Sequence, residues 1–229
     1  MKKEVVLRLS TEHNLKGTLI CVEGIDGSGK STQLAILRDW LKSKNLDVIF
    51  TEWNSSELIS QTTKKAKKKN LLSPRTFSLL HAVDFADRLE QIIIPALKAG
   101  FIVLADRYVY TAFARDVARG VDKEWVRNMY GFAVKPDLTL YYSINAETSL
   151  ERICSNRTPS FYEAGMDLKL SNNPYKSYVI FQNMVNTEYL QMVDEFGLVK
   201  IDAQQSIHAK QVKMRELVKE CLAKKGIIL

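Results

Sequence analysis

The sequence predicts an α/β fold in which helices cover both faces of a parallel β-sheet. Continuous apolar runs rich in β-branched residues, a pattern typical of buried strands, occupy residues 18–22, 101–105 and 138–142. Segments with helical periodicity separate these runs, and such alternation indicates a parallel sheet. A glycine-rich loop, Gly24–Thr32, joins the first run to the first helix. Ligands of such sheets bind at the carboxyl ends of the strands.

Local patterns predict the other elements in turn. A Ser-Pro pair at 73–74 indicates a helix start, and the helical pattern extends to residue 94. Pro95 either kinks this helix or begins a new turn, and Gly100 ends it. Residues 52–70 are polar and irregular. The remaining predicted strands are 47–51 and 198–201, and the remaining helices are 33–41, 123–134, 146–154, 175–196 and 206–223.

Length and composition predict one domain over residues 1–229, with 1–16 as an N-terminal extension. No apolar run approaches the roughly 20 residues of a membrane span, so we expect no membrane contact. Charged residues interrupt the first fifteen positions, so we expect no signal peptide. The three cysteines are far apart and lack metal-ligand spacing, which favours a reduced, cytoplasmic protein.

The formal net charge of +7 permits a nucleic-acid partner, but a cleft for polyanionic nucleotides favours the same balance. The densest basic run, Lys64–Lys69, contains no aromatic residue. A solvated face is the commonest explanation of such a run, and an anion-facing segment is the alternative. We therefore expect no nucleic-acid partner.

The loop Gly24–Thr32 fits G-x-x-x-x-G-K-[ST] at every fixed position, with a strand before it and a helix after it. Its glycines let backbone N–H groups turn toward phosphate oxygens, and the helix N-terminus adds partial positive charge. Lys30 should reach the β- and γ-phosphates of ATP, and the Ser31 hydroxyl should ligate Mg²⁺. The predicted nucleotide-binding residues are Gly24, Asp26, Gly27, Ser28, Gly29, Lys30, Ser31 and Thr32.

Asp106-Arg107-Tyr108 directly follows the apolar run 101–105. An aspartate at the carboxyl end of a buried strand lies where Walker-B-type residues act in phosphate-loop enzymes. Asp106 is therefore expected to orient water on Mg²⁺ or to position the acceptor phosphate.

The order of the motifs resembles the thymidylate kinase family of nucleoside monophosphate kinases, from about Lys16 to Ala223. The resemblance implies the phosphate-loop nucleoside monophosphate kinase fold and ATP-dependent phosphoryl transfer, most simply from ATP to dTMP. It also implies Mg²⁺, a lid-like segment at 155–172 and a homodimer. The motifs that carry it are Glu23–Gln33, Ile94–Leu97, Asp106–Tyr108 and Pro136–Tyr141.

The resemblance assigns roles to several charged residues. Asp26 would bind the acceptor sugar or water around Mg²⁺, Asp106 would support the metal, and Arg107 would clamp the acceptor phosphate through its planar guanidinium. Arg152 and Arg157 fall where the family has lid arginines, which neutralise charge in the transition state. Arg152 could instead pair with a glutamate on its own helix, at 147 or 151.

The acceptor site departs from the family pattern. Glu52–Ser56 stands in place of Arg-Glu-Pro-Gly-Gly, so one acceptor-site arginine is missing. The family's helix carries a base-stacking Phe four residues before an Arg. Two registers compete for these positions: one uses Phe85 and Arg88, and the other, counted back from Pro95, places His81 and Phe85 there.

Arg115 and Asp116 occupy the family's Tyr-Gln positions. Asp116 would then meet the nucleobase and Arg115 the sugar or phosphate, whereas the alternative is a local surface pair or a pair with Arg119. Because a carboxylate only accepts hydrogen bonds, a different monophosphate remains an alternative acceptor. An alternative from another class is a nucleic-acid-associated phosphate-loop ATPase.

Overall fold

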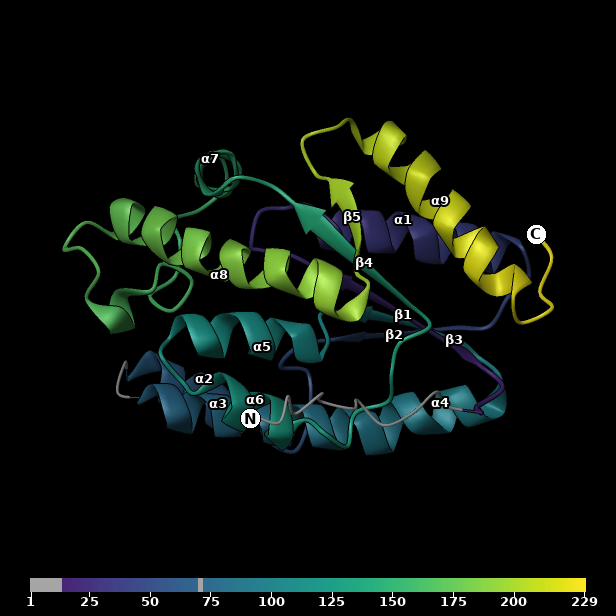
Figure 1. Cartoon of the computed structure of the whole chain (residues 1–229), viewed down its shortest axis with the longest axis horizontal. Helices are drawn as coiled ribbons and strands as arrows, with labels where there is room; N and C mark the ends of the chain where they lie inside the picture. Colours follow the sequence, from purple (N-terminus) through teal and green to yellow (C-terminus); the bar gives the residue numbers. More distant parts are fainter. Residues whose placement is uncertain (1–13, 70–71) are drawn as a thin grey trace, which may run out of the picture.

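The computed structural model describes residues 14–69 and 72–229, so most of the expected extension 1–16 lies outside the described residues. Five parallel strands form one sheet in the order β2-β3-β1-β4-β5, which confirms the predicted α/β class (Figure 1). The strands are β1 (Thr18–Glu23), β2 (Val48–Glu52), β3 (Ile102–Asp106), β4 (Leu138–Ser143) and β5 (Val199–Asp202).

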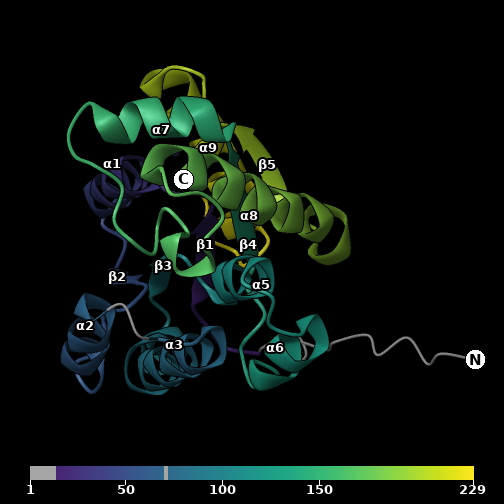
Figure 2. The same cartoon turned by 90° about the vertical axis from the view of Figure 1, so that its left-hand side faces the viewer.

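Helices cover both faces of the sheet. On one face α1 packs against α9, and on the other α5 packs against α8 and α3 (Figures 1 and 2). The helices before β3 are α1 (Lys30–Ser43), α2 (Ser60–Lys68), α3 (Pro74–Arg88), the π-helical turn η1 (Leu89–Ile93) and α4 (Ile94–Ala99). Those after it are α5 (Val109–Ala118), α6 (Lys123–Met129), α7 (Ala146–Cys154), the 3₁₀ turn η2 (Met166–Leu168), α8 (Pro174–Phe196) and α9 (Ile207–Ala223).

The central strand β1 sets the position of the ligand edge. All six of its residues are buried, and it lies between β3 and β4, where the chain reverses its direction of travel across the sheet. The register pairs Val22 with Asp106 and Glu52 with Asp106, so the carboxyl ends of β1, β2 and β3 meet at one edge. Such a reversal leaves a crevice at the carboxyl ends of the strands.

The long helix predicted after residue 73 begins and ends as expected, but a π-helical turn interrupts it between α3 and α4. Ser73 caps α3 by accepting a hydrogen bond from the Thr76 amide at 3.2 Å, and α4 ends at Gly100. Pro95 comes just after the π-helical turn η1. Since proline lacks an N–H and its ring crowds the preceding turn, a wider turn accommodates it.

Two helices were not predicted. The polar segment 52–70 contains α2, and α5 follows Tyr108 directly. Conversely, the helix predicted over 123–134 ends at Met129. Within the described ranges, no helix combines the length and the apolar character needed to cross a bilayer.

Candidate active site

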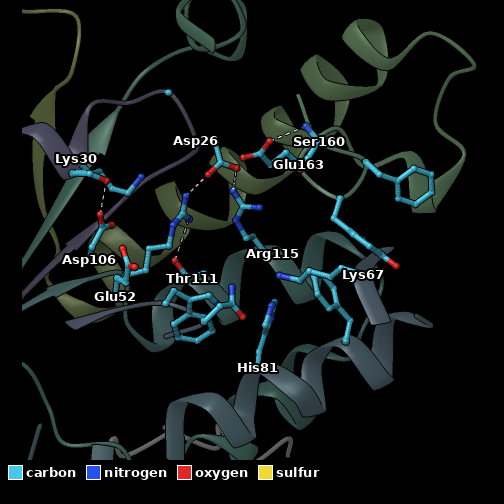
Figure 3. A pocket seen from close by; sticks show the side chains of 18 of the residues that line it. Asp26, Lys30, Glu52, Lys67, His81, Asp106, Thr111, Arg115, Ser160 and Glu163 are labelled. Atoms are coloured by element: carbon cyan, nitrogen blue, oxygen red, sulfur yellow. Dashed lines mark hydrogen bonds and ion pairs between the residues drawn. The ribbon is translucent and has the colours of Figure 1, made fainter. Parts of the chain in front are cut away.

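A cavity of about 730 Å³ opens at the carboxyl ends of β1, β2 and β3 (Figure 3). The phosphate loop and the start of α1 form one wall, and α2, α3 and α5 contribute the opposite side. The segment 157–163 closes a third side. The predicted site residues that line it are Asp26, Gly27, Gly29, Lys30, Ser31, Thr32, His81, Asp106, Arg107, Arg115 and Arg157.

Glycine is required at two positions of the phosphate loop. Gly24 and Gly27 have φ values of +140° and +73°, which side-chain-bearing residues rarely adopt. A Cβ atom at Gly24 would lie 2.6 Å from the Tyr142 carbonyl oxygen, and one at Gly27 would lie 2.7 Å from the Ser149 carbonyl oxygen. The loop therefore wraps closely against β4 and α7. Its residue Lys30 is also the first residue of α1.

The Lys30 ammonium lies inside this loop. Its Nζ donates to the Ile25 carbonyl oxygen at 3.1 Å and to Ser28 Oγ at 3.4 Å. Burial lowers the pKa of Lys30 to about 8, and Arg107 contributes to the shift although Asp106 and Asp26 oppose it. A buried cation held at the centre of a phosphate-binding loop is ready to pair with phosphate oxygens.

This depressed pKa makes nucleotide binding depend on pH. Above pH 8 the free Lys30 amine is largely neutral and must take up a proton to pair with phosphate. The dissociation constant for ATP should therefore rise by about a factor of eight between pH 7.5 and pH 9. Titration of a fluorescent ATP analogue measures this change. Lys30→Met should bind more weakly with no such slope; an equal slope in both proteins would contradict the assignment.

Two oxygen ligands suited to Mg²⁺ lie together at the end of β3. Ser31 Oγ donates to Asp106 Oδ2 at 2.5 Å, and both side chains line the cavity. Among the described residues no group of three or more His, Cys, Asp or Glu forms a metal cage. Mg²⁺ usually takes one or two protein oxygens and fills its shell with water and substrate phosphates. Ser31 and Asp106 therefore fit this metal.

Asp26 joins two arginines across the cavity. Its Oδ1 accepts a hydrogen bond from Arg107 at 2.5 Å, and its Oδ2 accepts one from Arg115 (Figure 3). Burial alone would raise the pKa of Asp26, but Arg115 and Arg107 hold it below its usual range. The alternative in which Arg115 forms only a surface pair does not fit this geometry, because its guanidinium binds Asp26 and lines the cavity. The two guanidinium groups present one cationic face to a phosphate.

The backbone at Arg107 is strained. Its φ is +73°, a left-handed conformation that costs a residue with a side chain about 1–3 kcal/mol. The next amide, Tyr108 N, donates to buried Glu23 at 2.7 Å, and Thr111 Oγ1 also donates to Glu23 at 2.7 Å. These bonds fix the start of α5 against β1, which aims Arg107 back toward Asp26.

An aromatic wall forms the end of the cavity opposite the phosphate loop. Phe77 and His81 lie one helical turn apart on α3, with ring centroids 4.3 Å apart, and Phe77 also contacts Tyr162 at 4.8 Å. Asp116, expected to meet the base, is fully buried behind His81 and accepts a hydrogen bond from Ser78 at 2.6 Å. It does not line the cavity.

Phe85 and Arg88 were expected to contact the substrate, but both side chains lie outside the cavity. Phe85 packs in the core, 4.9 Å from the Tyr108 ring. Arg88 is fully buried, and its guanidinium donates to Thr51 at 3.0 Å and to Asp84 at 3.4 Å. Neither residue lines the cavity. One predicted register used Phe85 and Arg88, and the other used His81 and Phe85. Of these three residues only His81 lines the cavity, so the geometry favours the second register.

The two expected lid arginines differ. Arg157 lines the cavity and forms a two-pronged pair with Glu163, with both N–O distances at 2.7 Å. Arg152 instead donates to the Ala203 carbonyl oxygen at 3.1 Å, and it does not line the cavity. Arg119 ties α5 to the same lid-like segment, through Asp167 at 2.9 Å and the Tyr162 carbonyl oxygen at 2.7 Å.

Sequence reasoning missed several residues of the cavity, above all Lys67. This lysine projects from α2 into the site, and its Nζ lies 5.0 Å from the centre of the Phe77 ring. Burial lowers its pKa to about 8, with Arg115 and Arg119 adding to the effect. Within the basic run Lys67 and Lys68 line the cavity, whereas Lys65 does not line it and is exposed. The other lining residues that were not predicted as site residues are Glu52, Trp53, Asn54, Phe77, Thr111, Arg119, Ser160, Phe161, Tyr162 and Glu163.

A phosphate-binding loop that faces an arginine pair across one cavity defines a phosphate-loop phosphotransferase. A sequence model of the family "Thymidylate kinase" matches residues 22–214. "Probable thymidylate kinase 2" of Saccharolobus solfataricus is 44% identical over 208 residues, which cover 90% of this chain and 97% of that protein. "Thymidylate kinase" of Halothermothrix orenii is 30% identical over 216 residues, covering 92% and 100%. This chain belongs to the thymidylate kinase family.

Proposed function

We propose that this chain transfers the γ-phosphoryl group of ATP to dTMP, with Mg²⁺, to give ADP and dTDP. The observation that carries the proposal is that a phosphate-binding loop and a pair of arginines line the same cavity. Lys30 and Ser31 would form the donor end, and Arg107 with Arg115 would form the acceptor end. Family membership supports both the reaction and the acceptor.

At the donor end, Lys30 would pair with the β- and γ-phosphates of ATP from within the loop. Ser31 and Asp106 would hold Mg²⁺, which supplies charge neutralisation on the donor phosphates when bound. Because the loop N–H groups and Lys30 are already oriented, little reorganisation is needed as negative charge shifts toward the leaving ADP.

At the acceptor end, the Arg107 and Arg115 guanidinium groups would bind the phosphate of the monophosphate. Asp26 accepts a hydrogen bond from each of them and so holds the two groups next to each other. The attacking oxygen belongs to a phosphate that is already anionic, so the reaction needs no general base from the protein. Positioning and charge neutralisation then supply the catalysis.

A coupled assay of ADP release over the common ribo- and deoxyribonucleoside monophosphates tests this function. We expect dTMP to give the highest kcat/KM and purine monophosphates to give little turnover. Preference for a purine acceptor would contradict the assignment of dTMP but leave the kinase reaction intact. ADP release that depends on DNA and on no monophosphate would support the nucleic-acid-associated ATPase instead. The homodimer and the cytoplasmic location stay predictions.

Arg157 provides a test of the lid-like segment. If its guanidinium leaves Glu163 to bind the phosphoryl group in the transition state, Arg157→Lys keeps the charge but loses the two-pronged geometry. We expect kcat to fall by about tenfold or more with little change in the KM for dTMP. Steady-state kinetics measure both constants, with the exposed Arg38→Lys as control. A raised KM with unchanged kcat would make Arg157 a ground-state binder.

A further inference from the structure

The imidazole of His81 lies at the cavity wall. Only 3% of the residue is exposed, and neither Nδ1 nor Nε2 has a hydrogen-bond partner among the residues that the structure describes. Three other lining residues carry buried polar atoms without a partner among the described residues: the donors Trp53 Nε1 and Arg115 Nε and the acceptor Asn54 Oδ1. Buried polar groups are almost always paired, so unpaired atoms concentrated in one cavity wall indicate a polar ligand.

The position of His81 is fixed by aromatic rings on two sides. Its ring centroid lies 4.3 Å from that of Phe77 and 5.5 Å from that of Trp53, the latter in an edge-to-face arrangement. Figure 3 shows the ring rising from α3 toward the cavity, below Arg115 and Lys67. A ring held in this way presents its nitrogens in a fixed direction, which is the geometry that base recognition requires.

The carboxylate of Asp116 influences which nitrogen of His81 carries the proton. Its Oδ1 lies 3.7 Å from His81 Nδ1, and its Oδ2 is occupied by the Ser78 hydroxyl at 2.6 Å. A carboxylate at this distance favours a proton on Nδ1, which leaves a lone pair on Nε2. The separation exceeds a hydrogen bond, and such contacts commonly tighten when substrate binds.

Burial favours the neutral form of this imidazole. Burial lowers the pKa of His81, and the nearby cations Lys67 and Arg119 also lower it, while Asp116 opposes the shift. A neutral ring with its proton on Nδ1 offers the cavity an acceptor at Nε2 and no donor at that nitrogen.

We propose that His81 Nε2 accepts a hydrogen bond from the imide N3–H of the acceptor base, and that Asp116 is the positioning residue that sets the tautomer. This inference rests on the proposed function and names the feature by which the site recognises its acceptor. Thymine and uracil both carry an imide N–H. Cytosine has a lone pair at the same ring position, which would face the lone pair of His81 and leave both unpaired.

Asp116→Asn should reverse this preference. With Ser78 donating to the amide oxygen, the amide NH₂ faces His81 and donates to Nδ1. The proton then moves to Nε2, and His81 becomes a donor suited to cytosine N3. A buried residue with a purely structural role would weaken all acceptors alike, whereas a change of tautomer improves one acceptor while it weakens the other.

The experiment compares kcat/KM for dTMP, dUMP and dCMP in four proteins: wild type, Asp116→Asn, His81→Phe and the exposed Asp194→Asn control. We expect the wild type and the control to favour dTMP and dUMP over dCMP by about a hundredfold. In Asp116→Asn the ratio of dTMP to dCMP should fall at least about tenfold, with an absolute rise for dCMP. His81→Phe, which keeps the ring contacts, should lose the discrimination with no such rise.

Nitrogen-15 spectra of the imidazoles give a second readout that needs no turnover, because the chain has only three histidines. With dTMP bound, His81 should carry its proton on Nδ1 in the wild type and on Nε2 in Asp116→Asn. A proton on Nε2 in the wild type, or unchanged discrimination in His81→Phe, overturns the inference while the kinase reaction stands. Absence of transfer to every monophosphate would instead overturn the proposed function.

Discussion

Replacement of Lys30 by alanine should lower turnover by at least about a hundredfold, because it removes the ammonium group held inside the phosphate loop. The ammonium lies between the Ile25 carbonyl oxygen and Ser28 Oγ, where it would meet phosphate oxygens at the point of transfer. Initial rates of ADP formation at saturating ATP and dTMP measure the loss.

The fold of this variant should survive. Because burial depresses the pKa of Lys30, its charge destabilises the free protein below about pH 8, and this contribution fades as pH rises toward the ordinary lysine pKa. Removal of the ammonium therefore relieves a cost at neutral pH, and thermal unfolding should show no large fall in Tm. Near-normal turnover in a folded Lys30→Ala protein would contradict the assignment of the phosphate loop as the ATP site.

Arg107→Lys should reduce kcat/KM for dTMP by about a hundredfold, while the KM for ATP changes little. The guanidinium binds Asp26 and Thr111, and in the proposed function it would also bind the acceptor phosphate; one ammonium cannot replace that planar set of donors. The left-handed backbone at this position strains lysine and arginine alike, so the change tests the side chain alone.

Arg38→Lys, on the exposed face of α1, is the matched control for Arg107→Lys. A double variant with Arg115→Lys should lose less than the product of the two single losses, because both arginines bind Asp26 and, in the proposed function, the same phosphate. If kcat/KM for dTMP changes by less than threefold in Arg107→Lys, Arg107 does not bind the acceptor phosphate.

The donor end could be predicted from the sequence because its geometry is local. The glycines, Lys30 and Ser31 all lie within positions 24–31, and a strand and a helix hold this segment on either side. Asp106 could be predicted as well, because a buried strand ends at it and parallel strands end at the same edge.

The acceptor end depends on tertiary packing, which spacing along the chain does not reveal. Arg115 and Asp116 are adjacent in sequence, yet α5 turns the first into the cavity and the second into the core behind His81. Lys67 reaches the cavity only because α2 forms within a segment that reads as polar and irregular. The spacing of Phe77 and His81, one helical turn apart, was the signal that could have identified this wall.

Direct transfer across the cavity is most plainly tested by following the γ-phosphate of ATP. ATP labelled in that group is mixed with the protein, Mg²⁺ and dTMP, and the products are separated after rapid quenching. Transfer between the two ends of one cavity predicts that the label appears in dTDP from the first turnover, with negligible inorganic phosphate, and that no label is released without an acceptor. Label released as inorganic phosphate at the same rate with and without dTMP would contradict it.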